Sequence, residues 1–123
     1  MVILLVEDNV AVQLLIWRLL KEDGFTVSNA DSSEAALEAS RGHLGSIDML
    51  LSDVLLPHAD GLALSNMIAA ERPGIKVLMM SGNLRIREGV STHSLPFIQK
   101  PFTLAALRNS IDMVLGPMRS TGH

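Results

Sequence analysis

Short apolar runs alternate with longer amphipathic segments along this chain of 123 residues. Apolar runs of this length, bounded by polar or turn-forming residues, are typical of buried strands. The longer segments between them carry apolar residues at helical spacing, and such an alternation predicts a parallel sheet covered by helices on both faces. We expect strands near residues 2–6, 25–29, 48–52, 75–80 and 96–98, and helices near 10–23, 33–41, 61–72, 83–89 and 103–115.

Polar and turn-forming residues indicate where the expected helices begin and end. Asn9 is placed to cap the first helix, because a short polar side chain can accept a hydrogen bond from a free backbone N–H. Gly24 is placed to end that helix, since glycine tolerates the left-handed turn that commonly follows one. Either Asp31 or Ser32 can cap the second helix, and the third must stop before Pro73.

The first expected helix carries apolar residues on two adjoining faces. One stripe has the i, i+3, i+4, i+7 spacing of a helix face packed on a core, and the second lies beside it. Two interpretations remain open: the helix is more buried than usual, or the second stripe is an apolar docking surface for a partner. The first stripe comprises Val12, Leu15, Ile16 and Leu19, and the second comprises Val10, Leu14 and Trp17.

Polar residues follow four of the expected strands, at the point where each apolar run ends. Because the carboxyl ends of parallel strands meet at one edge of a sheet, where open α/β sheets bind ligands, we expect these groups to lie together. Three carboxylates in one small site repel one another unless a divalent cation is bound. The pattern predicts a phosphoryl site with Mg²⁺, in which Asp53 carries the phosphoryl group. The groups are Glu7 and Asp8, then Asp53, Ser81 and Lys100.

The composition predicts one globular domain and excludes several classes of function. Hydrophobic residues make up 48% of the chain and charged residues 19%, which is typical of a folded α/β domain. A net charge of −3 provides no basic surface for nucleic acid, and the absence of cysteine excludes disulfides and thiolate zinc sites. No apolar stretch approaches the roughly 20 residues of a membrane span, and no basic segment precedes the first run as in a signal peptide. We therefore expect a cytoplasmic protein without nucleic-acid or membrane partners.

Four motifs stand in order along the chain: Leu4-Leu5-Val6-Glu7-Asp8-Asn9, then Asp53-Val54-Leu55-Leu56-Pro57 with Asp60-Gly61, then Ser81-Gly82, then Lys100-Pro101-Phe102. With these motifs the chain resembles the receiver domain of two-component response regulators, from Val2 to about Leu115. The resemblance implies a flavodoxin-like (βα)5 fold: a doubly wound α/β domain whose five-stranded parallel sheet has the order 2-1-3-4-5. It also implies two helices on one face and three on the other. We interpret Asp60-Gly61 as a helix cap and turn without chemistry.

The resemblance also implies roles for the acidic residues. Asp53 matches the phosphoacceptor aspartate, a nucleophile that we expect to be ionised at neutral pH and to need only charge neutralisation and in-line positioning. Asp8 matches the principal metal carboxylate, and Glu7 matches its neighbour, which acts through water. The backbone carbonyl of Leu55 matches a further ligand. Mg²⁺ prefers hard oxygen ligands and keeps several waters, so this set together with Asp53 is sufficient.

The remaining motif residues match groups that contact the phosphoryl group or respond to it. Lys100 matches the lysine that pairs with phosphoryl oxygens, and Pro101 after it matches a cis proline. Ser81 matches the switch hydroxyl, and Gly82 leaves the site open to a donor or to water. Phe97 matches the aromatic switch residue, although a plain core aromatic is the alternative. Without a hydroxyl, Phe97 can rotate inward for packing but cannot gain or lose a hydrogen bond.

One spacing departs from the family pattern. Ser81 and Lys100 stand 19 residues apart, which is shorter than we expect for the family. The shortage falls between residues 83 and 96, where loop-forming residues are frequent, so we expect a shortened or irregular fourth helix. The sequence around Phe97 is similar to receivers attached to hybrid sensor histidine kinases. We expect residues 1–116 to form the receiver domain and residues 117–123 to form a disordered tail.

The leading hypothesis is a phosphoacceptor domain that takes a phosphoryl group from the phosphohistidine of a sensor histidine kinase or phosphotransfer protein and then switches a surface for a downstream protein. Such a domain catalyses its own phosphorylation and dephosphorylation, and it is not a turnover enzyme on a separate substrate. The main alternative is a pseudo-receiver that is not phosphorylated and signals by docking alone. An enzyme of similar topology is a third possibility. A flavin protein conflicts with Glu7 and Asp8, which would repel phosphate, and an aspartyl phosphohydrolase usually has a second aspartate where Leu55 stands.

Overall fold

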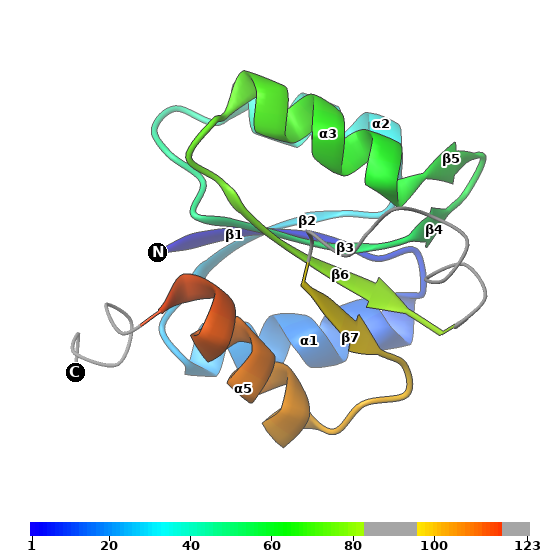
Figure 1. The fold of residues 1–123 in the computed structure, drawn as a ribbon, viewed down its shortest axis with the longest axis vertical. Helices are drawn as coiled ribbons and strands as arrows, with labels where there is room; N and C mark the ends of the chain where they lie inside the picture. Colours follow the sequence, from blue (N-terminus) through cyan, green and yellow to red (C-terminus); the bar gives the residue numbers. More distant parts are fainter. Residues whose placement is uncertain (83–95, 117–123) are drawn as a thin grey trace.

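The computed structural model describes residues 1–82 and 96–116, and in these ranges a parallel sheet runs through the centre of the molecule (Figure 1). The sheet has five strands in the order β2-β1-β3-β6-β7, so the predicted order along the chain is confirmed. Each predicted strand lies within one residue of the observed bounds. The strands are β1 (Val2–Val6), β2 (Thr26–Ala30), β3 (Met49–Asp53), β6 (Lys76–Ser81) and β7 (Phe97–Gln99).

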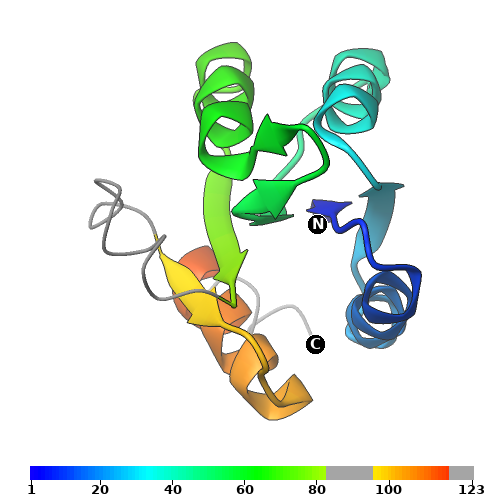
Figure 2. The same ribbon diagram turned by 90° about the vertical axis from the view of Figure 1, so that its right-hand side faces the viewer.

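Helices cover both faces of this sheet. Figure 2 looks onto the carboxyl edge of the strands, with α2 and α3 on one side of the sheet and α1 and α5 on the other. The fourth helix predicted near residues 83–89 and the tail predicted at 117–123 lie outside the described residues. No helix within the described ranges is long and apolar enough to cross a membrane. The helices are α1 (Val10–Glu22), α2 (Ser33–Gly42), α3 (Gly61–Glu71) and α5 (Leu104–Leu115).

Short polar side chains begin the helices as the sequence predicts. The Asn9 side chain accepts a hydrogen bond from the Val12 N–H at 3.1 Å. Ser32, rather than Asp31, caps α2 by accepting from the Ala35 N–H. These bonds satisfy backbone donors that the first turn of a helix leaves free, and they fix where each helix leaves the sheet.

A small antiparallel hairpin, which the apolar pattern did not predict, lies between β3 and α3. Its strands are β4 (Leu55–Leu56) and β5 (Ala59–Asp60), and Figure 1 places it beside the carboxyl edge of the main sheet. The turn between them consists of Pro57 and His58, and His58 has a positive φ of 54°. A proline followed by a residue with positive φ is the arrangement of a type II turn.

The core consists of two apolar layers, one on each face of the sheet. Side chains of β1 alternate between them: Ile3 and Leu5 pack with α1 and α5, whereas Leu4 and Val6 pack with α2 and α3. All four are fully buried. A strand covered on both faces reads as a continuous apolar run, which is why the pattern in the sequence located β1.

The face of α1 that packs on the core differs from the predicted stripe. Leu15 was expected to be buried but its side chain is 53% exposed, whereas Leu20 is fully buried. The buried face is centred on Ile16 and Leu20, and Leu15 lies about 100° around the helix from Ile16. Val10 and Leu14 are exposed, as expected of a surface stripe, but Trp17 packs against the core.

Two leucines of α1 therefore provide a matched test of this packing. We expect Leu20→Ala to lower the free energy of unfolding by about 2–5 kcal/mol, because it leaves a cavity in the core. Leu15→Ala should cost no more than about 1 kcal/mol, because the side chain is already half in water. Urea unfolding of both variants measures the difference. Equal losses would contradict the packing of α1 described here.

Candidate functional site

The predicted site residues meet at the carboxyl edge of the sheet. Asp53 is the last residue of β3 and Ser81 is the last residue of β6. Glu7 directly follows β1 and Lys100 directly follows β7. The Lys100 N–H donates to the Ser81 carbonyl at 2.8 Å, so the strand pairing continues up to the site.

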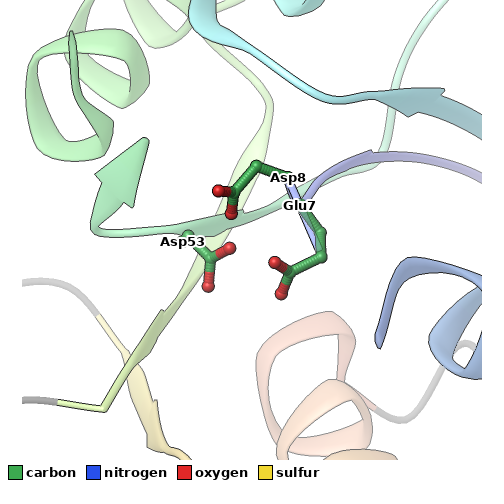
Figure 3. Close-up of side chains that lie close together, drawn as sticks. All are labelled: Glu7, Asp8 and Asp53. Carbon is green, nitrogen blue, oxygen red and sulfur yellow. The ribbon is translucent and has the colours of Figure 1, made fainter. Parts of the chain in front are cut away.

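Three carboxylates lie close together at this edge (Figure 3). Glu7, Asp8 and Asp53 each place one carboxylate oxygen within 4.8 Å of the others. Glu7 and Asp53 are buried and Asp8 is exposed, so the cluster extends from the interior of the site to its surface. A set of hard oxygen donors at this spacing can hold a metal ion.

Lys100 bridges the two buried carboxylates. Its Nζ lies 2.6 Å from Glu7 Oε1 and 2.6 Å from Asp53 Oδ1. The Asn9 N–H donates to the other oxygen of Glu7 at 3.0 Å. The resemblance implied that Lys100 pairs with a phosphoryl group and that Glu7 acts on a metal through water. The structure adds a direct contact between the two residues, which the sequence pattern did not predict.

One carboxylate oxygen of the site has no partner in the part of the chain that the structure describes. Asp53 Oδ2 is buried and accepts no hydrogen bond from any described residue. Buried polar atoms are almost always paired, so an unpaired carboxylate oxygen indicates a position that a ligand completes. A cation fits this position, because cations of this kind prefer carboxylate oxygens and Asp8 contributes another such oxygen to the same cluster.

The two buried carboxylates, Glu7 and Asp53, have shifted pKa values. Burial, together with the hydrogen bond and charge of Glu7, raises the pKa of Asp53 to about 7, although Lys100 opposes this increase. Burial also acts to raise the pKa of Glu7, but hydrogen bonds from Asp53, Lys100 and Asn9 outweigh it and lower that pKa. With these neighbours alone, Asp53 is only partly ionised at neutral pH. The expectation of full ionisation needs correction, because it ignored the cost of burying a charge beside Glu7.

The carbonyl of Leu55 remains available as a ligand because of its place in the hairpin. The Gly61 N–H donates to the Val54 carbonyl at 2.6 Å, and Leu55 pairs with Asp60 in the next position. Antiparallel pairs alternate between hydrogen-bonded and non-hydrogen-bonded positions, so Leu55 occupies a non-hydrogen-bonded one. Its carbonyl therefore points out of the hairpin. The side chain of Leu55 is exposed.

The residues expected to act as switches lie next to the site. Ser81 is buried at the end of β6, and Gly82 after it is exposed. Phe97 is half-buried, pairs with Met79 across the sheet, and packs against the core layer of α2 and α3. The peptide bond between Lys100 and Pro101 is cis, as the resemblance implied. The switch roles of Ser81 and Phe97 stay predictions.

An apolar groove borders the site on the side of α1. It encloses about 440 Å³ and includes the exposed side chain of Leu15. Val10 and Leu14, the other exposed apolar residues of α1, lie on the same helix. The docking surface on α1 stays a prediction. If it exists, its exposed residues include Leu15 and do not include Trp17, which packs against the core. The groove is lined by Val12, Leu15, Ile16, Gly82, Lys100, Pro101 and Phe102.

Comparison with known proteins decides the family. The model of the response regulator receiver domain matches residues 3–112. The chain belongs to this family. It is 34% identical to the sensor kinase CckA of Brucella abortus (strain 2308) over 92% of this chain, and 30% identical to the transcriptional regulatory protein ZraR of Escherichia coli K12 over 96%. The chain spans 12% and 27% of these two relatives.

A solved structure supports the same assignment. The receiver domain from the hybrid histidine kinase CckA is 30% identical, with a TM-score of 0.81, and the match covers 94% of this chain and all of that one. This receiver is therefore a phosphoacceptor module of two-component signalling, with the flavodoxin-like fold that the motifs implied. The alternative of an unphosphorylated pseudo-receiver is not favoured.

The raised pKa of Asp53 predicts how stability depends on pH. The folded receiver holds the Asp53 proton up to a pH of about 7, whereas the ordinary pKa is 3.8, so folding is favoured in acid and this contribution is lost as pH rises through 7. In chelator, raising the pH from 5 to 8 should lower the free energy of unfolding by on the order of 2 kcal/mol relative to Asp53→Asn. The lowered pKa of Glu7 affects stability only at pH values below this range.

Urea unfolding of both proteins across this pH range measures the effect. Subtracting the Asp53→Asn curve removes contributions from histidines, which also titrate there. Mg²⁺ should stabilise the unsubstituted protein more at pH 8 than at pH 5, because ligand carboxylates must be deprotonated. Parallel pH profiles for the two proteins would contradict the raised pKa.

Proposed function

We propose that Asp53 accepts a phosphoryl group from the phosphohistidine of a sensor histidine kinase or a phosphotransfer protein, in the presence of Mg²⁺. The observation that carries this proposal is the buried Oδ2 of Asp53, which has no hydrogen-bond partner among the described residues, in a cluster with the carboxylates of Glu7 and Asp8. It gives the family's phosphoacceptor chemistry a specific nucleophile. The ATP that charges such kinases is intracellular, so the proposal includes a cytoplasmic location for this receiver.

Asp8, Asp53 and the carbonyl of Leu55 would hold the metal, with Glu7 acting through a water molecule. When bound, Mg²⁺ supplies positive charge that neutralises the carboxylates and the phosphoryl oxygens. The residues fit this task because a buried oxygen of Asp53 has no partner within residues 1–82 and 96–116, and the carbonyl of Leu55 points out of its hairpin. Neutralisation matters here because Asp53 must lose its proton to act as a nucleophile, and its pKa of about 7 opposes this.

The transfer step moves one phosphoryl group between two residues. A carboxylate oxygen of Asp53 forms a bond to phosphorus while the phosphorus–nitrogen bond of the donor histidine breaks, and the electron pair returns to the imidazole. Lys100 already lies 2.6 Å from Asp53 Oδ1, so its ammonium needs little movement to contact the phosphoryl oxygens. Water later hydrolyses the acyl phosphate. The receiver thus acts on itself and has no separate turnover substrate.

The added charge changes the surface through neighbouring residues. We propose that the Ser81 hydroxyl donates to a phosphoryl oxygen and that Phe97 changes its packing in response. A phosphoryl group adds about one to two negative charges, which is enough to rearrange a local hydrogen-bond network. The donor would dock along the apolar groove beside Lys100, where Leu15 is exposed. The surface changed by Ser81 and Phe97 would bind a downstream protein.

Replacing the acceptor should abolish phosphorylation. With a small acyl phosphate and Mg²⁺, the unsubstituted receiver should gain one phosphoryl group, and Asp53→Asn should gain none, because an amide cannot form the acyl phosphate. Intact-protein mass spectrometry measures the gain. Asp60→Asn is the matched control: it keeps an oxygen that can cap α3 and should be phosphorylated normally. Uptake by Asp53→Asn would contradict the proposal.

Replacing Lys100 should lower the rate of phosphorylation and raise the affinity for Mg²⁺. Lys100→Met should slow phosphorylation by about a hundredfold, because a donor to the developing negative charge is lost. The same variant should bind Mg²⁺ more tightly, because the ammonium no longer occupies the carboxylates of Glu7 and Asp53. Phosphorylation rates and metal titrations measure the two effects. Weaker metal binding in Lys100→Met would show that Lys100 helps to assemble the site rather than competing with the cation.

A further inference from the structure

The backbone of α3 begins in direct contact with the backbone of Asp53. Helix α3 starts at Gly61, and a Cβ atom at this position would overlap the Asp53 carbonyl oxygen. It would also lie 2.9 Å from the carbonyl oxygen of Val54. Both obstacles are main-chain atoms, which cannot rotate away as a side chain can. The contact therefore requires glycine at position 61 for steric reasons, without any need for positive φ.

This contact closes the hairpin that carries the Leu55 carbonyl. The Gly61 N–H donates to the Val54 carbonyl at 2.6 Å, which joins the two ends of the hairpin. Leu55 lies one residue from this closure and pairs with Asp60. The direction of the Leu55 carbonyl is thus set by how closely α3 approaches β3.

The other side of the contact is held by the main sheet. The Val54 N–H donates to the Met80 carbonyl at 2.9 Å, and Asp53 pairs with Met80 in the parallel register of β3 and β6. Asp53 therefore cannot move away from α3 without breaking its pairing with β6. A side chain at position 61 would push α3 and the hairpin outward, and the Leu55 carbonyl would move with them.

We propose that Gly61 is a positioning residue of the cation site: it allows α3 to close the β4–β5 hairpin against Asp53 and so directs the Leu55 carbonyl. The proposal rests on the proposed function, because it takes Asp53 and Leu55 as cation ligands. Mg²⁺ requires near-ideal octahedral geometry at about 2.0–2.1 Å, so a small displacement of one ligand weakens binding.

The test compares divalent-cation affinity in matched glycine variants of the whole chain. Mn²⁺ titrations followed by electron paramagnetic resonance report affinity without any phosphoryl donor. We expect Gly61→Ala to bind Mn²⁺ roughly tenfold more weakly than the unsubstituted protein. Gly42→Ala is the control, because a Cβ there meets no atom within 4 Å, and its affinity should be unchanged. Unchanged Mn²⁺ affinity in Gly61→Ala would overturn the proposal.

A loss of stability alone must be separated from a loss of positioning. Ile68 lies in the same helix, seven residues from Gly61, and is fully buried in the core, so Ile68→Val is a matched control for stability. It should lower the midpoint of unfolding yet leave Mn²⁺ affinity unchanged. If Ile68→Val weakens Mn²⁺ binding as much as Gly61→Ala does, Gly61 has only a structural role and the proposal fails.

A second measurement uses the unsubstituted protein, so it holds even if Gly61→Ala does not fold. If hairpin closure directs a cation ligand, cation binding must in turn stabilise the closure. Mg²⁺ should therefore slow hydrogen exchange of the Gly61 amide by several-fold, whereas the Ala35 amide, capped by Ser32 in α2, should be unaffected. Exchange of the Gly61 amide that does not respond to bound Mg²⁺ would overturn the proposal.

The Mn²⁺ titrations and the hydrogen-exchange measurement do not depend on phosphorylation. A receiver that binds Mn²⁺ but accepts no phosphoryl group would refute the proposed function, and the effect of Gly61→Ala on affinity would still support or refute the positioning role. A receiver that binds no divalent cation would refute the role of Gly61 directly.

Discussion

The structure of this site depends on two buried carboxylates that share one ammonium. Glu7 and Asp53 both lie within 2.6 Å of Lys100 Nζ, and the remaining oxygen of Asp53 has no partner among the described residues. Burying two like charges together is costly, and one cation compensates for it only in part. The result is a carboxylate with a pKa raised to about 7. Such a group is poised to gain either a proton or a second cation.

The fold makes this costly arrangement possible by fixing every backbone that carries it. The strands β1, β3, β6 and β7 are paired side by side and packed on both faces. Glu7 and Lys100 can therefore be held near Asp53 although they are 93 residues apart in sequence. Under the proposed function, the hairpin and the start of α3 would add a further ligand group, the carbonyl of Leu55. The packed core thus offsets the cost of burying these charges at the edge.

The strands of the sheet and the residues at their carboxyl ends could be predicted from the sequence, because fully buried strands appear as continuous apolar runs. The runs at Val2–Val6 and Met49–Ser52 located β1 and β3, and strand polarity then placed Glu7, Asp53 and Lys100 at one edge. Side-chain contacts across the site could not be read in this way. The bridging position of Lys100 and the raised pKa of Asp53 depend on distances that no local pattern encodes.

Two further features were missed for identifiable reasons. Leu15 fits a helical stripe as well as Leu20 does, and only the actual direction of α1 decides which of them faces the core. Gly61 looked like an ordinary turn residue after Asp60. Its role depends on the close approach of the Asp53 backbone, which lies eight residues earlier in the sequence, and no local pattern reveals that approach. The available clue was a glycine at the first position of an apolar helix, where helix preferences alone would allow serine or alanine.

The most direct test of this account is the titration of the Asp53 carboxyl group itself, followed by the chemical shift of its carboxyl carbon in a labelled receiver. In chelator, the carboxyl group should titrate with a midpoint near the pKa of about 7. Saturating Mg²⁺ should lower that midpoint by at least about one pH unit, because the cation favours the ionised form. A midpoint near the ordinary pKa of 3.8 in chelator, unmoved by Mg²⁺, would contradict the account.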